Sequence, residues 1–572
     1  MNTNENLVTS SSGDEENKFV TEKMNENFKL SDKGEQRITV ESVLPTFGGK
    51  KWYQLKHFRK LVFSVWIISW ASCLSGYDGS IFNGLYSEPG FNNAIGNVTG
   101  STLGALSNGM VFGNFIMLLP LIKSASLASY CCDKYGRKTC IIWSNVVIII
   151  GVVIQSLAGV WKYNYDATYK KKDVFGMLLA ARIVIGMGGT VTSLASISLL
   201  SEISYPSFRQ VLGVMYNSNW YLGAIVAAWI TFGLRNVTHK DVNWRVPTIL
   251  QCMFSILQVV FVPFFVPESP RWLVSKGRIQ EARDTLVEYH TGGCAEGEEL
   301  IDYELTEIQL ALEQEAIVQK EASFKELFAT NANRKRMWIV MWIGIFMQFS
   351  GNGLVSYYLS KVLNSIGYKK VSEQLIINAG LMIFNYGVCL IQSFWIIPYL
   401  RKRTLVIKLG VGGMLVSFII WTALSATAQK GDFKNHKLGQ GVLAFIFIFY
   451  FFYNLALNGL PILYVTEILP FKIRAKGLSL WTLVQVIVMI YNGFVNPIAM
   501  DAIHWKYYLV FVCILAVEFA VCFTFIETSG RTLEEVAECF GDGIENLGAV
   551  SGIAALTDGE LKQKQAETEH IE

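Results

Sequence analysis

One carboxylate stands near the end of the first long apolar stretch of the chain. The stretch runs from Trp66 to Phe82 and carries Asp78. A carboxylate at membrane depth costs roughly 2.5–3.5 kcal/mol on insertion scales, so it needs a partner or it takes up a proton. A second apolar stretch, 175–200, carries the cation Arg182 close to its start. We expect Asp78 and Arg182 to meet inside a transmembrane bundle, where Asp78 binds and releases a proton. The alternative is that both residues solvate helix ends at the membrane–water boundary.

The composition is that of a membrane protein. The 572 residues are 52% hydrophobic and only 17% charged, with a net charge of +3, whereas a soluble domain averages ~25% charged residues. This apolar content excludes a nucleic-acid binder. The ten cysteines are scattered and show no metal-ligand spacing. We therefore expect neither a metal site nor a cofactor, and no cleavable signal peptide ahead of the first apolar stretch.

Twelve apolar stretches recur along the chain, each near the ~20 residues that a bilayer core requires. They cover about 61–82, 106–128, 140–160, 175–200, 211–233, 246–266, 337–360, 374–399, 405–426, 441–463, 478–500 and 507–526. Twelve spans place both termini on one side of the membrane. Lysine and arginine gather in the loops on that side, which predicts that it is cytoplasmic.

The two halves of the chain repeat one charge pattern. Glu202 precedes Arg209 by seven residues, and Glu467 precedes Arg474 by seven. A parallel repeat of this kind is typical of major-facilitator transporters. We predict an all-α membrane protein of twelve transmembrane helices in two six-helix halves with a cytoplasmic helical linker. The expected parts are a disordered cytoplasmic tail over 1–58, the halves over 59–266 and 337–530, the linker over 267–336 and a cytoplasmic tail over 531–572.

Three motifs resemble those of the sugar-porter family of the major facilitator superfamily. They are Pro267-Glu268-Ser269-Pro270-Arg271, Asp133-Lys134-Tyr135-Gly136-Arg137-Lys138 and Glu527-Thr528-Ser529-Gly530-Arg531. The resemblance covers about residues 60–540. A finer likeness to the fungal lactose-permease-like branch lies in Ser350-Gly351-Asn352-Gly353-Leu354, Asn217-Ser218-Asn219-Trp220, Arg474-Ala475-Lys476-Gly477 and Trp505-Lys506-Tyr507-Tyr508.

The resemblance implies a cytoplasmic gate of ion pairs that form and break during transport. Desolvation offsets most of the attraction in such pairs, so they can be broken at little cost. The candidate gate residues are Asp133, Arg137, Glu202, Arg209, Glu268, Arg271, Glu467 and Arg474; the alternative for each is an ordinary positive-inside anchor. The second half lacks the family's acid and glycine at 397–403, so its gate should be looser or differently paired.

The resemblance also implies a sugar site near midplane between the halves. A sugar needs amide and hydroxyl groups for hydrogen bonds and aromatic rings for stacking. By resemblance, Asn217, Gln348, Tyr357 and Gln485 fall on sugar-contacting positions. The full candidate set is Asn217, Gln348, Asn352, Tyr357, Tyr358, Asn385, Asn458 and Gln485. The alternative for each lone amide is a hydrogen bond between helices, worth ~0.6 kcal/mol on average in membranes.

The resemblance implies a proton-coupled sugar symporter of a fungal plasma membrane, with no enzymatic activity. The expected partners are a sugar, protons and the lipid bilayer, and the expected state is a monomer. The substrate expected from the branch likeness is a disaccharide such as lactose. A hexose, pentose or polyol transporter is the alternative, and a non-transporting sugar sensor is a further one.

Overall fold

The computed structural model describes residues 50–541 apart from short gaps, together with residues 44, 45 and 47. The gaps are 97, 120–125, 160–170, 236, 238–241, 322–323, 397–401, 431–435, 530–535 and 537–538. Most of the two predicted tails, 1–58 and 531–572, lies outside the described residues.

The first half of the chain is a bundle of long helices. They are α3 (Lys56–Leu85), α5 (Gly100–Leu118), α7 (Arg137–Ser156), α8 (Lys171–Ile203), α9 (Arg209–Leu234), α10 (Val242–Leu250) and α11 (Met253–Phe265), with the short helices α4 (Pro89–Ile95) and α6 (Leu127–Tyr135) between them. Within this half α3 packs on α9, and α8 packs on both α5 and α7. Buried apolar side chains of these helices form one continuous core.

The second half repeats this arrangement. Its helices are α15 (Asn331–Phe349), α16 (Asn352–Asn364), α17 (Val371–Ile391), α19 (Arg403–Lys430), α20 (His436–Leu457), α21 (Leu460–Ile468), α22 (Phe471–Ile503) and α23 (Tyr507–Val521). A short π-helical segment, η8 (Gln392–Ile396), extends α17. Here α19 packs on α20 and α23, and α15 packs on α22.

The two halves meet through reciprocal helix pairs. Helix α5 of the first half packs on α22 of the second, and α9 packs on α17. In terms of the predicted spans, the second span of the first half packs on the fifth span of the second half. The fifth span of the first half packs on the second span of the second half. Helix α3 packs on α16, which pairs the two first spans. Reciprocal contacts of this kind are those of two related units around one pseudo-two-fold axis, where transporters place their sites.

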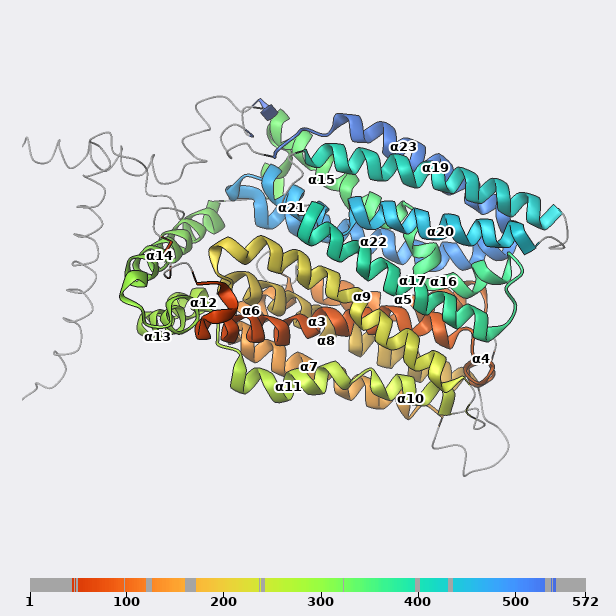
Figure 1. The fold of residues 1–572 in the computed structure, drawn as a ribbon, viewed down its shortest axis with the longest axis horizontal. Coiled ribbons are helices and arrows are strands. Elements are labelled where there is room, and N and C mark those ends of the chain that lie inside the picture. Colours follow the sequence, from red (N-terminus) through yellow and green to blue (C-terminus); the bar gives the residue numbers. More distant parts are fainter. Residues whose placement is uncertain are drawn as a thin grey trace, which may run out of the picture.

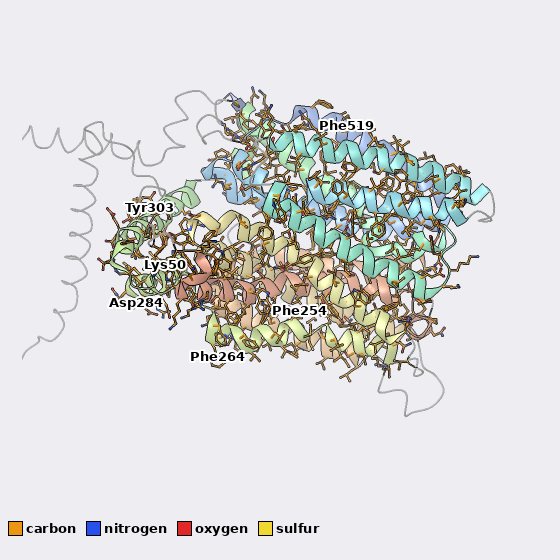
Figure 2. The ribbon with its side chains drawn as sticks, viewed as in Figure 1. Lys50, Phe254, Phe264, Asp284, Tyr303 and Phe519 are labelled. Carbon is orange, nitrogen blue, oxygen red and sulfur yellow. The ribbon has the colours of Figure 1, made fainter. Side chains whose placement is uncertain are left out.

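The segment between the halves folds into helices at one end of the bundle (Figure 1). They are α12 (Pro270–Ser275), α13 (Ile279–Leu286), the π-helical turn η5 (Val287–Thr291) and α14 (Glu298–Glu321). Leu273, Leu286 and Ile301 form a small core of their own. Asp284 and Tyr303 lie in this linker, whereas Phe264 points outward from the flank of α11 (Figure 2).

Most of the long helices have the length and apolar composition that a bilayer demands. Nine described segments qualify as candidate membrane spans, and the last of them, Lys476–Thr524, covers both α22 and α23. Large apolar side chains are exposed on these segments, as Phe264 at 80% and Trp143 at 67% show. Such exposure would be unfavourable in water and is expected against lipid, so the chain is a multi-pass membrane protein.

A glycine breaks the seventh predicted span into two helices. Helix α15 ends at Phe349, and Gly351 adopts a φ of +97° before α16 begins at Asn352. A Cβ atom at Gly351 would lie 2.7 Å from Phe418 Cε2. Both the positive φ and this close contact therefore exclude larger residues from this position. The break directs Asn352 and Ser356 of α16 toward α20, where both find hydrogen-bond partners.

Candidate functional site

Asp78 lies inside the first half, on a helix that is buried on nearly all sides. Its side chain is 2% exposed, and its Oδ1 atom has no hydrogen-bond partner among the described residues. The side chain of Gln251 and the charge of Arg182 both act on this carboxylate. A buried carboxylate with one unsatisfied oxygen is a group that a proton can satisfy.

Arg182 is brought to the same level by the packing of α8 on α5. Its side chain is 4% exposed, and its Cζ atom lies 3.8 Å from the centre of the Phe82 ring, one helical turn beyond Asp78. Gly109 of α5 makes room for it, because a Cβ atom there would lie 2.8 Å from Arg182 Cβ. Cation–π contact stabilises a desolvated guanidinium by about 2 kcal/mol, which helps to hold this charge within electrostatic range of Asp78.

Several predicted substrate residues lie where the two halves meet. Asn217 of α9 donates from Nδ2 to Asn458 Oδ1 just beyond α20, across the interface. Asn458 in turn donates from Nδ2 to Cys389 Sγ. Asn217 is exposed although it lies within α9, eight residues after the first residue of that helix. An exposed amide at this depth faces an aqueous space between the halves rather than lipid.

Asn352 belongs to a hydroxyl-rich cluster between α16 and α20. Its Nδ2 atom donates to the Tyr453 hydroxyl at 3.0 Å, and its Oδ1 atom accepts from Ser356 at 2.7 Å and from Tyr450 at 3.0 Å. Tyr358 lies apart from this cluster: it is fully buried and donates to the Gly493 carbonyl at 2.8 Å. The backbone of Tyr357 lies in α16, but its side chain is outside the described residues.

Asn385 takes part in a hydrogen-bond chain that sequence reasoning missed. The Tyr221 hydroxyl of α9 donates to Asn454 Oδ1 at 2.7 Å, and Asn454 Nδ2 donates to Asn385 Oδ1 at 3.0 Å. The Nδ2 atom of Asn385 has no partner among the described residues. Asn454 could have been found from its position in α20, because it lies only four residues before the predicted residue Asn458.

Helix α22 presents a second set of unsatisfied polar atoms. Trp481, Gln485 and Asn492 lie on one face, and Trp481 Nε1, Gln485 Nε2 and Asn492 Oδ1 lack partners among the described residues. Asn492 Nδ2 donates to the Gln348 carbonyl at 2.6 Å, which places α22 beside the end of α15. Buried polar groups are normally paired, so these atoms and Asn385 Nδ2 have unused hydrogen-bonding capacity.

Four of the six predicted gate residues of the first half form one network at the linker end. The Arg137 guanidinium lies 3.3 Å from Asp133 and 3.4 Å from Glu202. Glu268 accepts from the backbone N–H groups of Arg137 at 2.9 Å and Lys138 at 3.1 Å. This carboxylate therefore caps the N-terminus of α7, where a negative charge is favoured.

Two other predicted gate residues of this half are placed differently. Arg271 pairs with Glu315 of α14 in the linker rather than with an acid of the bundle. Arg209 begins α9 and is exposed, and it forms no ion pair within the described part of the chain. The ion pairs of this network are therefore those of the Arg137 guanidinium with Asp133 and Glu202.

The second half builds a comparable network from different residues. Arg403 pairs with Glu467, which also accepts from the Thr528 hydroxyl at 2.8 Å. Glu527 accepts from the backbone N–H groups of Arg403 at 2.9 Å and Thr404 at 3.0 Å, and so caps α19 as Glu268 caps α7. Residues 397–401 of the altered motif lie outside the described residues. Arg474 donates to the Leu469 carbonyl at 3.1 Å and has no ion pair among the described residues.

The hydrogen bonds to Glu527 govern its charge. Burial opposes ionisation of this carboxyl, but the Thr404 hydroxyl and the N–H groups of Arg403, Thr404 and Ser529 outweigh burial and lower its pKa. The carboxylate form is therefore the one that the folded protein favours.

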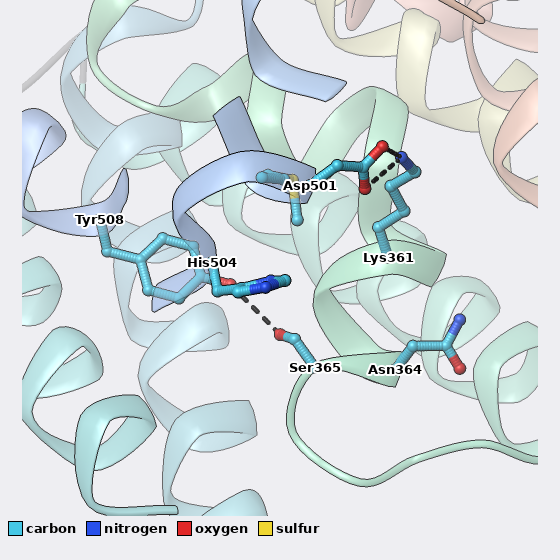
Figure 3. Close-up of a pocket in the computed structure, with 7 residues that line it drawn as sticks. Lys361, Asn364, Ser365, Asp501, His504 and Tyr508 are labelled. Atoms are coloured by element: carbon cyan, nitrogen blue, oxygen red, sulfur yellow. Dashed lines mark hydrogen bonds and ion pairs between the residues drawn. The ribbon is translucent and has the colours of Figure 1, made fainter. Parts of the chain in front are cut away.

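A separate cavity lies in the second half, between the C-terminal ends of α16 and α22 (Figure 3). It measures about 200 Å³ and lies among Lys361, Asn364, Ser365, Met500, Asp501, His504 and Tyr508. Lys361 Nζ pairs with both carboxylate oxygens of Asp501 at 2.8 Å. None of the amides described above lines this cavity, so it is distinct from them. Within the described ranges no group of three or more His, Cys, Asp or Glu residues could hold a metal ion.

Comparisons with known proteins agree with this geometry. A family model described as "Sugar (and other) transporter" matches residues 64–540. The chain is 27% identical to Hexose transporter 2 of Kluyveromyces lactis, over 84% of this chain and 82% of that protein. It is 29% identical to Sugar transporter STL1 of Saccharomyces cerevisiae, over 73% and 70%. It is 30% identical to Low-affinity glucose transporter HXT3 of the same yeast, over 72% and 70%.

Solved structures show the fold. The structure of the major facilitator proton:xylose symporter XylE is 18% identical, with a TM-score of 0.66 over 84% of this chain and 99% of that chain. The inward-open form of XylE from E. coli is 20% identical, with a TM-score of 0.65 over 84% and 99%. The predicted all-helical membrane fold is confirmed.

Proposed function

Because this chain belongs to the sugar (and other) transporter family of the major facilitator fold, we propose that it is a proton-coupled symporter that imports a sugar across the plasma membrane. It is not an enzyme. The observation that carries the coupling is the burial of Asp78, 2% exposed, within the electrostatic reach of Arg182. Protonation of Asp78 neutralises the acid and frees Arg182, so proton binding changes the forces between α3 and α8.

The sugar binds between the halves. Unsatisfied atoms of Asn385, Gln485 and Asn492 supply donors and an acceptor, and the Asn217–Asn458 bond is one that a hydroxyl group can replace. Each hydrogen bond made to a polar group that is otherwise unsatisfied contributes about 1–3 kcal/mol. Because these residues come from both halves, a bound sugar holds the halves together and coordinates their movement.

Alternating access then consists of rocking the halves about this site. The networks at Arg137–Glu202 and Arg403–Glu467 close the cytoplasmic side and separate when it opens. The inward membrane potential contributes ~2.3 kcal/mol per charge per 100 mV to a proton that enters with the sugar. The basic loops support a cytoplasmic position for the linker and both termini, and the protein acts as a monomer.

The proposed substrate is a disaccharide such as lactose, which follows from the likeness to the lactose-permease-like branch. A hexose is the second candidate, because the relatives above are named as hexose and glucose transporters. Uptake of a panel of radiolabelled sugars in a yeast that lacks its own transporters distinguishes the two. Uptake should collapse with an uncoupler; uptake that is unchanged by the uncoupler would instead identify a passive carrier.

A further inference from the structure

A buried histidine joins the cytoplasmic linker to the membrane bundle. His290 of η5 is 2% exposed, and Glu304 of α14 is 6% exposed. His290 Nδ1 lies 2.8 Å from Glu304 Oε2, and His290 Nε2 lies 3.1 Å from the carbonyl oxygen of Ile203. One imidazole therefore contacts the linker helix α14 and the last residue of α8 together.

The atoms in these two contacts determine how many protons the pair holds. A backbone carbonyl only accepts hydrogen bonds, so His290 Nε2 carries a hydrogen. A proton must also lie between Nδ1 and Glu304 Oε2, because without it a lone pair would face a carboxylate oxygen at 2.8 Å. Whether that proton is on nitrogen or oxygen, the closed pair contains one more proton than a neutral histidine beside a carboxylate.

We propose that His290 and Glu304 form a proton-dependent latch that holds the linker against the cytoplasmic end of α8. The latch closes when the shared proton is present, and it opens as the cytoplasmic pH rises and the proton leaves. Ile203 follows Glu202, the acid that pairs with Arg137, so the latch acts one residue away from the proposed gate.

The other titratable groups around the pair come from two further elements. Tyr205, between α8 and α9, lies edge-on to His290 with 5.5 Å between ring centres, and the charge of Glu304 reaches it. His57 of α3 is buried and interacts electrostatically with His290. A positive charge on His57 would oppose a positive charge on His290 and would therefore favour loss of the shared proton.

The test is amide hydrogen exchange of the segment 286–292 in the full-length protein in lipid nanodiscs, from about pH 5.5 to about pH 9. Glu304→Gln is the informative variant. A glutamine amide donates to Nδ1 while Nε2–H still donates to Ile203, so this variant closes the latch without the extra proton at alkaline pH. At each pH, the exchange rate of the wild-type protein is divided by that of Glu304→Gln. This ratio cancels the intrinsic base catalysis of amide exchange, which is the same in both proteins.

The latch predicts that this ratio is constant at acid pH and then rises about tenfold per pH unit, the slope for one proton released on opening. A ratio that stays flat over the whole range would overturn the proposal. Asp302→Asn is the matched control, because Asp302 joins α14 to Arg283 of α13 through an exposed pair; its exchange should retain the wild-type pH dependence. If Glu304→Gln does not fold, His290→Gln replaces it as the reference that lacks the titrating ring.

Discussion

The hydroxyl of Tyr221 donates to Asn454 Oδ1 at 2.7 Å and so joins the two halves of the bundle inside the membrane. Tyr221 belongs to α9 and is 7% exposed, whereas Asn454 belongs to α20 and is fully buried. Asn454 also orients Asn385, whose Nδ2 atom is unsatisfied. This bond therefore connects the first half with Asn385, a candidate sugar-binding residue of the second half.

Removing that hydroxyl should weaken sugar binding. Tyr221→Phe leaves the Asn454 oxygen without its donor and so weakens the orientation of Asn454, the residue that holds Asn385. Loss of one such bond corresponds to about 1–3 kcal/mol, or roughly 5- to 150-fold in affinity. The measurement is the dissociation constant of the transported sugar. Tyr216→Phe is the control on the same helix, because the Tyr216 hydroxyl bonds to Ser193 within one half. Equal effects of the two changes would exclude a special role for the contact between the halves.

Neutralising the buried acid should uncouple protons from sugar. In Asp78→Asn the amide cannot take up the proton, so sugar added to cells should no longer make the medium alkaline, while sugar binding is retained. Asp501→Asn serves as the control, because Asp501 is an exposed acid paired with Lys361 at the opposite end from the linker. Persistent alkalinisation by the Asp78→Asn protein would remove Asp78 from the coupling step.

Alanine substitutions at Gln485 and Gln374 should distinguish a residue that binds sugar from one that packs helices together. Gln485→Ala removes a donor that has no partner among the described residues, so sugar affinity should fall by about 1–3 kcal/mol with little change in thermal stability. Gln374 instead donates to Asn364 and to the Tyr368 carbonyl at 2.8 Å. Gln374→Ala should therefore lower the melting temperature and leave affinity unchanged. The reverse pattern would assign Gln485 to packing.

The same logic applies to Gln348, whose carbonyl accepts from Asn492. Gln348→Ala keeps this backbone bond and removes only the side-chain amide. Sugar affinity should again fall by about 1–3 kcal/mol, as measured by equilibrium binding to the purified protein. Wild-type affinity in this variant would take Gln348 out of the site.

The carboxylate of Glu527 should make stability depend on pH. The pKa of Glu527 in the folded protein is lower than the ordinary pKa of a glutamate side chain. The charge of Glu527 therefore stabilises the fold fully at any pH above the ordinary pKa. This stabilisation is lost as the pH falls through the lowered pKa of the folded protein. Glu527→Gln should therefore melt at a lower temperature than wild type at neutral pH, and the difference should shrink below about pH 4.5. A difference that is independent of pH would show that the hydrogen bonds, rather than the charge, stabilise this end of α19.

Much of the architecture follows from the sequence because its signals are local. Apolar length alone identifies membrane helices, since the bilayer sets the length. Carboxylates are rare within such stretches, so the position of Asp78 in the sequence is enough to mark it as a functional candidate. The family was predicted from three short motifs and is confirmed by the match over residues 64–540.

Contacts between distant segments required the tertiary structure. The pairing of Arg403 with Glu467, where the second-half motif is altered, depends on how α19 meets the end of α21. Tyr221 and Asn454 are 233 residues apart, and each looks like an ordinary helix residue in sequence. The contact of His290 with both Glu304 and the Ile203 carbonyl likewise involves a backbone atom, which sequence patterns do not report. Hydropathy and length act on each helix separately, but hydrogen bonds between helices depend on rotation and register, which only packing decides.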